Sequence, residues 1–182
     1  MAQVAMPDNA GVIIDIGCGK GQLVEALAAR YDESYCLGID IDDDIYYARN
    51  EAKLKHYQNI QFVRADFMYL PLRRGCSQLI FCASVLEHLR NVQTPLREVS
   101  AILTTNGKFL VGVPTENRIY RIGRKLARLP RPLDHFHNGE YLKTMVEREF
   151  SLIRVLKLPS RFLPKFFSLY LIMVCTKRML DV

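Results

Sequence analysis

The sequence has few cysteines, and they are not arranged for cross-linking or for binding zinc. Five cysteines occur among the 182 residues, an odd number, and no two of them form a Cys-x-x-Cys pair. Cys36 and Cys82 lie inside apolar runs, where a free cysteine behaves as a small buried hydrophobe. We therefore expect a reduced, cytoplasmic protein without a disulfide framework or a zinc site.

Targeting signals and membrane-spanning runs are also missing from the sequence. The first ten residues contain no basic region followed by an apolar core of signal-peptide length. The longest late apolar stretch, residues 166–175, is too short to cross a bilayer and contains Ser168, so we expect a strand there. Hydrophobic residues make up 49% of the chain, and its length fits a single domain over residues 1–182.

What the sequence does have is a glycine-rich turn between a short apolar run and a periodic segment. Residues 12–16 read Val-Ile-Ile-Asp-Ile, which predicts a strand buried on both faces, and Gly17, Gly19 and Gly21 follow at alternate positions. Glycines permit a tight turn and let a ligand approach the backbone closely. The helix that follows would direct its N-terminal amides at that ligand, so this segment predicts a cofactor cradle.

The spacing of the glycines argues against a dinucleotide as the cofactor. The dinucleotide fingerprint is G-x-G-x-x-G, whereas here the pattern is Asp-x-Gly-x-Gly-x-Gly. Asp15 at the end of the strand would repel a pyrophosphate but would suit a cationic amine or sulfonium. A Tyr-x-x-x-Lys pair is absent too, which disfavours a nicotinamide oxidoreductase.

Acidic residues also end the next two predicted strands. Asp40 follows the strand at 35–39, where an acid can accept hydrogen bonds from both ribose hydroxyls, and Asp66 follows the strand at 60–64. An alternative for the acidic run that starts at Asp42 is that it caps the helix beginning near Ile45, and both roles can hold together.

These motifs resemble class I S-adenosylmethionine-dependent methyltransferases of the small-molecule type. The segment from Asp15 to Gly21 is similar to the first motif of that family, and the fourth strand, 78–82, runs into a segment similar to its fourth motif. The resemblance covers residues 11–113, and the remainder only by topology. It implies S-adenosyl-L-methionine as cofactor, with the methionine end on the glycine turn and after the fourth strand, and the adenine near the third. The implied cofactor-binding residues are Asp15, Gly17, Cys18, Gly19, Gly21, Asp40, Ile41, Asp66, Phe67, Ala83 and Ser84.

The predicted elements give an α/β fold that is doubly wound around a mostly parallel, seven-stranded sheet. Strands are expected near 11–16, 35–39, 60–64, 78–82, 107–113, 151–158 and 167–176, and helices near 20–30, 43–55, 94–104, 138–148 and 117–129. No helix separates the last two strands, so they should be antiparallel neighbours. The resemblance implies a Rossmann-like strand order of 3-2-1-4-5-7-6, with the last strand antiparallel.

Basic residues are concentrated late in the chain. Residues 1–113 hold 11 Lys/Arg and 13 Asp/Glu, whereas residues 114–182 hold 14 and 6. Many relatives carry helices before the first strand that close over the cofactor, and only ten residues precede it here. We expect the segment 114–140 to act as a basic substrate lid, followed by C-terminal strands in 141–182. A chain truncated at Glu116 should then keep a recognisable cofactor half, over 11–113, but lose its acceptor selectivity.

Residues 117–131 form the amphipathic part of this segment. They fit peripheral contact with an anionic membrane, binding of an acidic or phosphorylated substrate, contact with RNA, or an ordinary solvated helix. Nucleic acid is disfavoured because the fourth motif, Cys-Ala-Ser-Val, lacks the Asn/Asp-Pro-Pro-aromatic signature of enzymes that methylate base amino groups. A homodimer is a further possibility.

Histidines are the candidates for a general base. A hydroxyl acceptor has to lose its proton, and a positioned histidine is the usual means, so we take His88, His135 and His137 as catalytic candidates. His88 alternatively hydrogen-bonds locally, and the other two alternatively pack in a loop. Asp134 with His135 and His137 also suggests a metal cluster, but no third spaced partner follows, and methyl transfer from a sulfonium needs no metal, so we predict none. His56 is expected on the surface.

Together these observations predict an S-adenosylmethionine-dependent methyltransferase. The acceptor would be a small or lipid-linked metabolite, methylated at oxygen in preference to carbon or nitrogen. One alternative is a cofactor-binding but non-catalytic scaffold or regulatory partner, and another is an RNA or protein methyltransferase.

Overall fold

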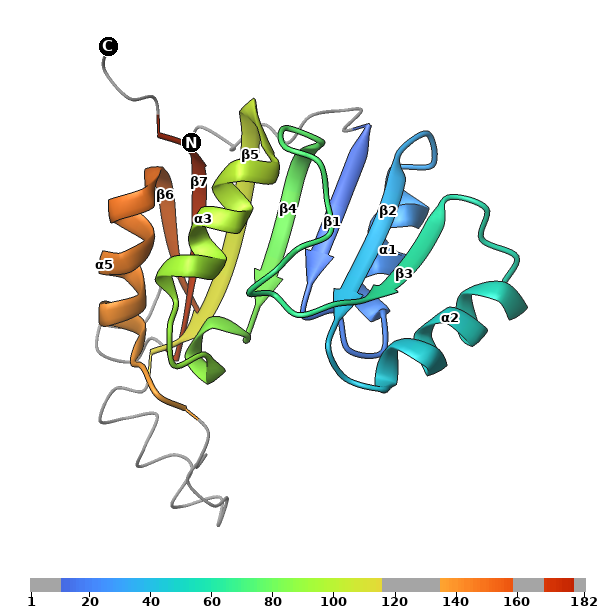
Figure 1. Cartoon of the computed structure of the whole chain (residues 1–182), viewed down its shortest axis with the longest axis horizontal. Helices are drawn as coiled ribbons and strands as arrows, with labels where there is room; N and C mark the ends of the chain where they lie inside the picture. Colours follow the sequence, from blue (N-terminus) through green and yellow to red (C-terminus); the bar gives the residue numbers. More distant parts are fainter. Residues whose placement is uncertain (1–10, 116–134, 159–168, 179–182) are drawn as a thin grey trace.

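The protein is built around one seven-stranded sheet. The computed structural model describes residues 11–115, 135–158 and 169–178, and their strands run in the order β3-β2-β1-β4-β5-β7-β6 (Figure 1). The strands are β1 (Val12–Ile16), β2 (Tyr35–Asp40), β3 (Ile60–Arg64), β4 (Ser77–Ala83), β5 (Leu103–Pro114), β6 (Phe150–Leu158) and β7 (Tyr170–Lys177). The first five are parallel, and β7 pairs antiparallel with both β5 and β6. The predicted fold and strand order are confirmed.

Helices cover both faces of the sheet. They are α1 (Gln22–Arg30), α2 (Asp44–Leu54), α3 (Gln93–Ile102) and α5 (Gly139–Glu149), with a short 3₁₀ helix, η1 (Leu86–His88). The apolar faces of α1 and α2 share one core cluster, and those of α3 and α5 share the other, which holds most of the buried side chains. In Figure 1, α3 and α5 lie in front of the sheet and α1 lies behind it.

The central strand β1 contributes to both clusters. Ile14 and Ile16 are buried in the cluster of α3 and α5, whereas Ile13 between them is buried in the cluster of α1 and α2. Successive side chains of a strand point to opposite faces, so a strand with helices on both sides needs apolar residues at consecutive positions. The run Val-Ile-Ile-Asp-Ile meets this requirement everywhere except at Asp15.

The chain crosses from β3 to β4 without a helix. Residues 65–76 are all described, and none of them is helical. Phe67 and Leu70 of this segment are buried in the larger core cluster, so two apolar side chains hold the crossing against the sheet. Figure 1 shows it passing in front of the strands.

The boundaries of β5 differ from the sequence prediction. The predicted helix over 94–104 ends at Ile102, because Leu103 already pairs with Ser77 of β4, and the strand extends to Pro114. Seven residues of β5, Lys108–Pro114, pair with β7. Side chains of α5 and β7 complete the core over β5, which argues against a cofactor half that folds without them.

The predicted helix over 117–129 and most of the basic segment lie outside the described residues. Among the helices of the described residues, none combines the length and apolarity required to cross a membrane.

Candidate functional site

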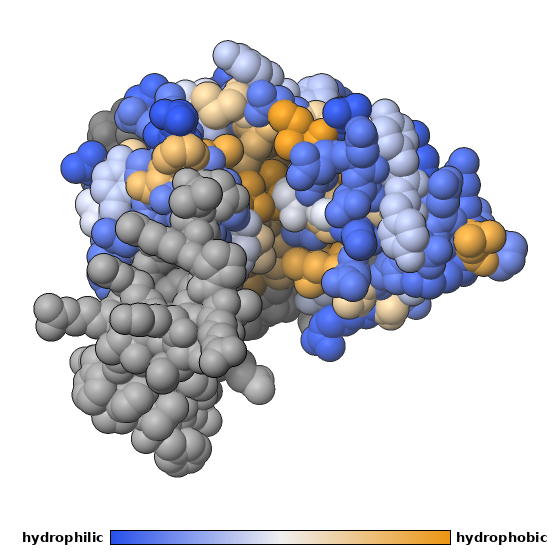
Figure 2. Space-filling model, turned by 90° about the horizontal axis from the view of Figure 1, so that it is seen from below, coloured by the Kyte–Doolittle hydropathy of each residue, from blue (hydrophilic) through white to orange (hydrophobic). Residues whose placement is uncertain are grey.

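The sequence motifs converge on one edge of the sheet. Because β1 to β5 are parallel, their carboxyl ends meet at the lower edge in Figure 1, and antiparallel β7 begins at this edge, where Tyr170 pairs with Pro114. Figure 2 looks directly onto this edge and shows apolar surface lying in a hollow between hydrophilic flanks. In open parallel sheets ligands bind outside the carboxyl ends of the strands, so this edge is the candidate site.

The glycine turn after β1 needs glycine at each of its three positions, but for different reasons. Gly17, Gly19 and Gly21 have φ values of 74°, 49° and 79°, in the left-handed region that L-residues with side chains disfavour. A Cβ on Gly17 would lie 2.1 Å from Cγ2 of Val85, and one on Gly21 would lie 2.6 Å from the ring of Phe62. A Cβ on Gly19 would meet nothing within 4 Å. Gly17 and Gly21 therefore allow close packing, whereas Gly19 borders open space that a ligand can occupy.

Asp40 at the end of β2 holds this turn. Its Oδ2 accepts a hydrogen bond of 2.7 Å from the Gly19 N–H, and its Oδ1 accepts one of 3.0 Å from the Asp42 N–H. The side chain of Ile41 next to it is 54% exposed. The acid predicted to bind ribose is thus fixed beside the turn predicted to bind the methionine end.

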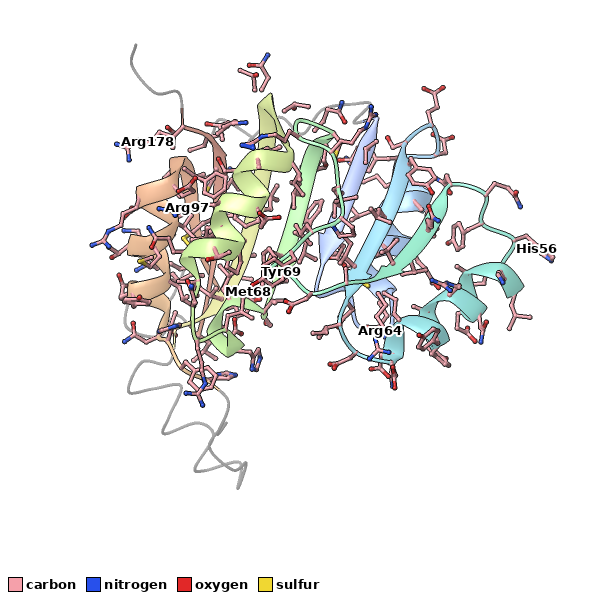
Figure 3. All side chains as sticks on the ribbon, viewed as in Figure 1. His56, Arg64, Met68, Tyr69, Arg97 and Arg178 are labelled. Atoms are coloured by element: carbon pink, nitrogen blue, oxygen red, sulfur yellow. The ribbon has the colours of Figure 1, made fainter. Side chains whose placement is uncertain are left out.

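The acidic run after Asp40 does not cap α2 with a side chain. Asp43 occupies the N-cap position, but its side chain makes no capping hydrogen bond. Its carboxylate instead pairs with Arg64 at the end of β3, with Nη1 and Oδ1 3.0 Å apart. Arg64 lies at the same edge of the sheet (Figure 3). The proposed cap is therefore wrong at Asp43, because its carboxylate is turned toward a cation on the neighbouring strand.

Asp15 is a buried acid beneath the turn. Its side chain is 4% exposed, and burial, with a smaller contribution from the charge of Asp40, raises its pKa to about 7. A cation that enters the site stabilises the carboxylate form of such a group. That Asp15 suits a cationic ligand stays a prediction from the sequence, and a buried carboxyl with a raised pKa is compatible with it.

The two residues predicted to contact adenine are in different environments. Asp66 is exposed after β3, and its Oδ1 accepts a hydrogen bond of 2.8 Å from the Met68 N–H. Phe67 is only 6% exposed and belongs to the core cluster. Met68 and Tyr69 follow on the crossing segment in front of the sheet (Figure 3). Asp66 is thus available to a ligand, whereas the ring of Phe67 packs mainly against the protein.

The end of β4 carries an unusual backbone conformation. Ala83 and Ser84 are both exposed, and Ser84 has φ 57°, which is rare for a residue other than glycine. The Ser84 N–H donates to the Gly112 carbonyl of β5 at 2.9 Å, and its Oγ lies 2.9 Å from the Tyr170 hydroxyl. Tyr170 comes from the start of β7, so three strands meet at this point.

The three catalytic candidates separate into a pair and a single residue. The rings of His88 and His135 meet edge to face, with centroids 4.7 Å apart. The His137 ring instead stacks on Tyr141 at 4.6 Å, and its Nε2 lies 3.3 Å from the Arg90 carbonyl oxygen. The segment that starts at His135 therefore brings His135 to η1, whereas His137 lies against Tyr141 and the Arg90 carbonyl.

Glu87 is close to the histidine pair. It is buried, and one ligand atom from each of Glu87, His88 and His135 lies within 4.8 Å of the others, an arrangement that can hold a metal ion. The metal cluster considered from the sequence included Asp134, which lies outside the described residues. The Phe136 N–H donates to the Glu87 carbonyl at 2.8 Å, and this bond joins the two segments.

Comparison with known proteins agrees with this geometry. Residues 14–111 match the family described as "Methyltransferase domain". The chain belongs to this family. The match runs from β1 into β5, so it includes the glycine turn and Asp40, and it confirms the resemblance found in the sequence.

The individual relatives of this methyltransferase domain are distant. The chain is 28% identical over 100 residues to the uncharacterized methyltransferase YcgJ of Bacillus subtilis, and this alignment covers 54% of this chain and 39% of the relative. It is 27% identical over 106 residues to the ubiquinone biosynthesis O-methyltransferase of Coxiella burnetii, covering 58% and 44%. The chain spans less than half the length of these relatives.

A solved structure supports the fold of the methyltransferase domain. The crystal structure of a SAM-dependent methyltransferase from Aquifex aeolicus superposes with a TM-score of 0.75 at 14% identity, and the alignment covers 94% of this chain and 85% of that one.

Tyr170 lies at the candidate site of this methyltransferase domain, although no motif in the sequence pointed to it. Only the antiparallel register of β7, which places Tyr170 opposite Pro114, brings it to the end of β4. The expected surface position of His56 is confirmed, since it is exposed at the far end of α2 (Figure 3).

Proposed function

We propose that this chain is an S-adenosylmethionine-dependent methyltransferase that methylates an oxygen of a small or lipid-linked metabolite. The observation that carries the proposal is the joining of the glycine turn to Asp40 above the buried Asp15. The arrangement combines three features: the glycine turn, whose backbone a ligand can approach, Asp40 as the acid for ribose, and Asp15 as the acid for a cation. The family membership of residues 14–111 supports the same conclusion.

The strand order suggests how the cofactor would lie. The strands β3, β2 and β1 are consecutive neighbours in the sheet, and they are followed by Asp66, Asp40 and the glycine turn, respectively. β4 lies on the other side of β1. An adenosine group near Asp66 and Asp40 would place the methionine end over the turn, beside β4. The acceptor would then approach from the side of β4, β5 and β7.

The chemistry asks the protein mainly for alignment and for a base. S-adenosylmethionine, when bound, supplies a methyl group on a positive sulfur that departs as a neutral thioether. The residues of the chain hold the acceptor in line, exclude water and accept the hydroxyl proton. His88 and His135, which meet beyond the end of β4, are the preferred bases. We consider His137 less suited, because its ring contacts Tyr141 and the Arg90 carbonyl.

An oxygen acceptor is supported by the printed name of one relative, an O-methyltransferase of ubiquinone biosynthesis, although only part of that protein is matched. The proposals of membrane contact through 117–131, of a lid over 114–140 and of a homodimer rest on the sequence.

Transfer of a labelled methyl group tests the proposal. The chain would be incubated with S-adenosylmethionine labelled at the methyl group and with catechols, hydroxylated acids and short-chain quinols, with and without a metal chelator. We expect label in an oxygen-linked methyl group and no loss of activity with chelator. If the chain binds the cofactor but transfers no label to any acceptor, a non-catalytic scaffold becomes the better account. Loss of activity with chelator would instead indicate a metal at Glu87, His88 and His135.

A further inference from the structure

We propose that the hydroxyl groups of Ser84 and Tyr170 hold the acceptor hydroxyl beside the reacting methyl group. This inference rests on the proposed function and deepens it by assigning the acceptor side of the site. The family resemblance implied for Ser84 only a role in cofactor binding and gave Tyr170 no role.

The location of the pair is fixed by contacts on both sides. Val85, which follows Ser84, packs its side chain against Gly17, since a Cβ added to that glycine would lie only 2.1 Å from Cγ2 of Val85. On the other side, the Ser84 N–H is bound to Gly112 of β5. The hydroxyl pair therefore lies between the turn that would hold the methionine end and the strands from which the acceptor would approach.

The pair is held in place by features that a purely structural contact does not need. Ser84 keeps φ 57°, a conformation that costs a residue with a Cβ some free energy and that clusters at functional sites. A Cβ on Gly112 would lie 2.7 Å from both Cε1 and the hydroxyl oxygen of Tyr170, so the ring needs a glycine beneath it. A strained serine and a glycine platform together bring two hydroxyls to 2.9 Å.

The two hydroxyls are suited to orientation rather than to proton removal. A hydroxyl can both donate and accept, so a serine–tyrosine pair presents both functions to an acceptor oxygen. Burial raises the pKa of the Tyr170 phenol, which therefore stays protonated at neutral pH. The base would remain a histidine, and Ser84 and Tyr170 would set the position of the oxygen. Misplacing a reacting atom slightly costs a large factor in rate.

The test uses the full chain and catechol as the probe acceptor. Tyr170→Phe removes the hydroxyl and keeps the ring, and Ser84→Gly removes the other hydroxyl and accepts the positive φ. Tyr35→Phe is the matched control, because it removes a tyrosine hydroxyl that is bonded to Gln61 at the opposite edge of the sheet. Binding of S-adenosylhomocysteine, thermal unfolding and the pH profile of kcat/KM would be measured beside turnover.

We expect kcat/KM for catechol to fall at least tenfold in Tyr170→Phe and in Ser84→Gly. The double variant should lose little more than either single variant, because the two groups act as a unit. The affinity for S-adenosylhomocysteine should stay within twofold of wild type, and the midpoint of the pH profile should stay within a few tenths of a pH unit. Tyr35→Phe should match wild type in every measurement.

Three results would overturn the assignment. Unchanged kcat/KM in Tyr170→Phe would remove its role, and a parallel loss of S-adenosylhomocysteine binding would place the pair in the cofactor pocket instead. A wild-type chain that binds S-adenosylhomocysteine but does not methylate catechol would refute the assignment for a phenolic hydroxyl, the acceptor group that this probe presents. A chain that does not bind S-adenosylhomocysteine fails earlier, at the proposed function itself.

Discussion

At the scale of single residues, Asp15 is an acid whose burial reduces the stability of the folded protein. A strand buried on both faces would be more stable with an apolar residue at this position, yet the acid is kept beneath the turn. Burial disfavours its charge and raises its pKa to about 7. A bound cation would favour the charged form again.

This cost gives a prediction for stability against pH. Because the pKa of Asp15 is higher in the folded protein than in the unfolded chain, the folded state binds more protons between about pH 4 and pH 7. The stability present below pH 4 is therefore lost as pH rises to 7. We expect Asp15→Asn to be more stable than wild type at pH 8, by roughly 2–4 kcal/mol, and similar to it at pH 4.

Urea denaturation of ligand-free protein at both pH values measures the difference. Asp32, an exposed acid in the connection between α1 and β2, provides the control: Asp32→Asn retains Asp15 and should therefore match the stability of wild type at both pH values. An Asp15→Asn protein that is no more stable than wild type at pH 8 would mean that Asp15 is not a buried, destabilised acid.

At the scale of elements, the glycine turn divides into packing and binding positions. In Gly17→Ala the new Cβ would overlap Val85, and the residue would also keep φ 74°, so we expect a loss of stability of about 2 kcal/mol or more. In Gly19→Ala nothing obstructs the new Cβ, so only the backbone penalty of about 1 kcal/mol remains. S-adenosylhomocysteine should nevertheless bind Gly19→Ala at least tenfold more weakly, because the methyl group enters the space beside the ligand.

Thermal unfolding and binding titration of both variants check this division. Wild-type affinity in Gly19→Ala would show that the ligand does not approach that part of the turn.

The same elements show what could be read from the sequence. Period and composition placed β1 to β4 within one or two residues, because each is a short run with apolar residues at the positions that face the core. The end of α3 was misplaced by two residues, because pairing of Leu103 with Ser77 decides it, and such pairing between distant residues leaves no local signal. The prediction of a side-chain cap at Asp43 was wrong for the same reason. Arg64, which binds the Asp43 carboxylate instead, is brought near it only by the folded sheet.

At the scale of the whole molecule, the segment up to β5 and the segment that contains α5 and β7 share one core. Leu171, Met173 and Cys175 of β7 are buried in the cluster that contains Phe109 and Val111 of β5. α5 adds Leu142 and Val146 to it. The strand order was implied by the family resemblance. The position of Tyr170 was not, because it depends on the antiparallel register of β7.

The shared core argues against one expectation from the sequence, that of a cofactor half which remains recognisable after truncation at Glu116. We predict that a chain ending at Thr115 does not fold, because removing β7 and α5 exposes apolar side chains of β5 and leaves its edge unpaired. Circular dichroism and urea denaturation of this fragment, with the full chain as control, would show no cooperative transition. Cooperative unfolding together with S-adenosylhomocysteine binding would contradict this prediction and restore the idea of a separable cofactor half.

The central claim is that Asp40 and the glycine turn form the binding site for S-adenosylmethionine. Isothermal titration of the full chain with S-adenosylhomocysteine tests it most directly, with NAD titrated in parallel and with Asp40→Ala and Asp32→Ala as a matched pair of aspartate variants. We predict micromolar binding by wild type and Asp32→Ala, binding at least tenfold weaker by Asp40→Ala, and none of NAD. Equal binding by Asp40→Ala, or binding of NAD in place of S-adenosylhomocysteine, would contradict the account.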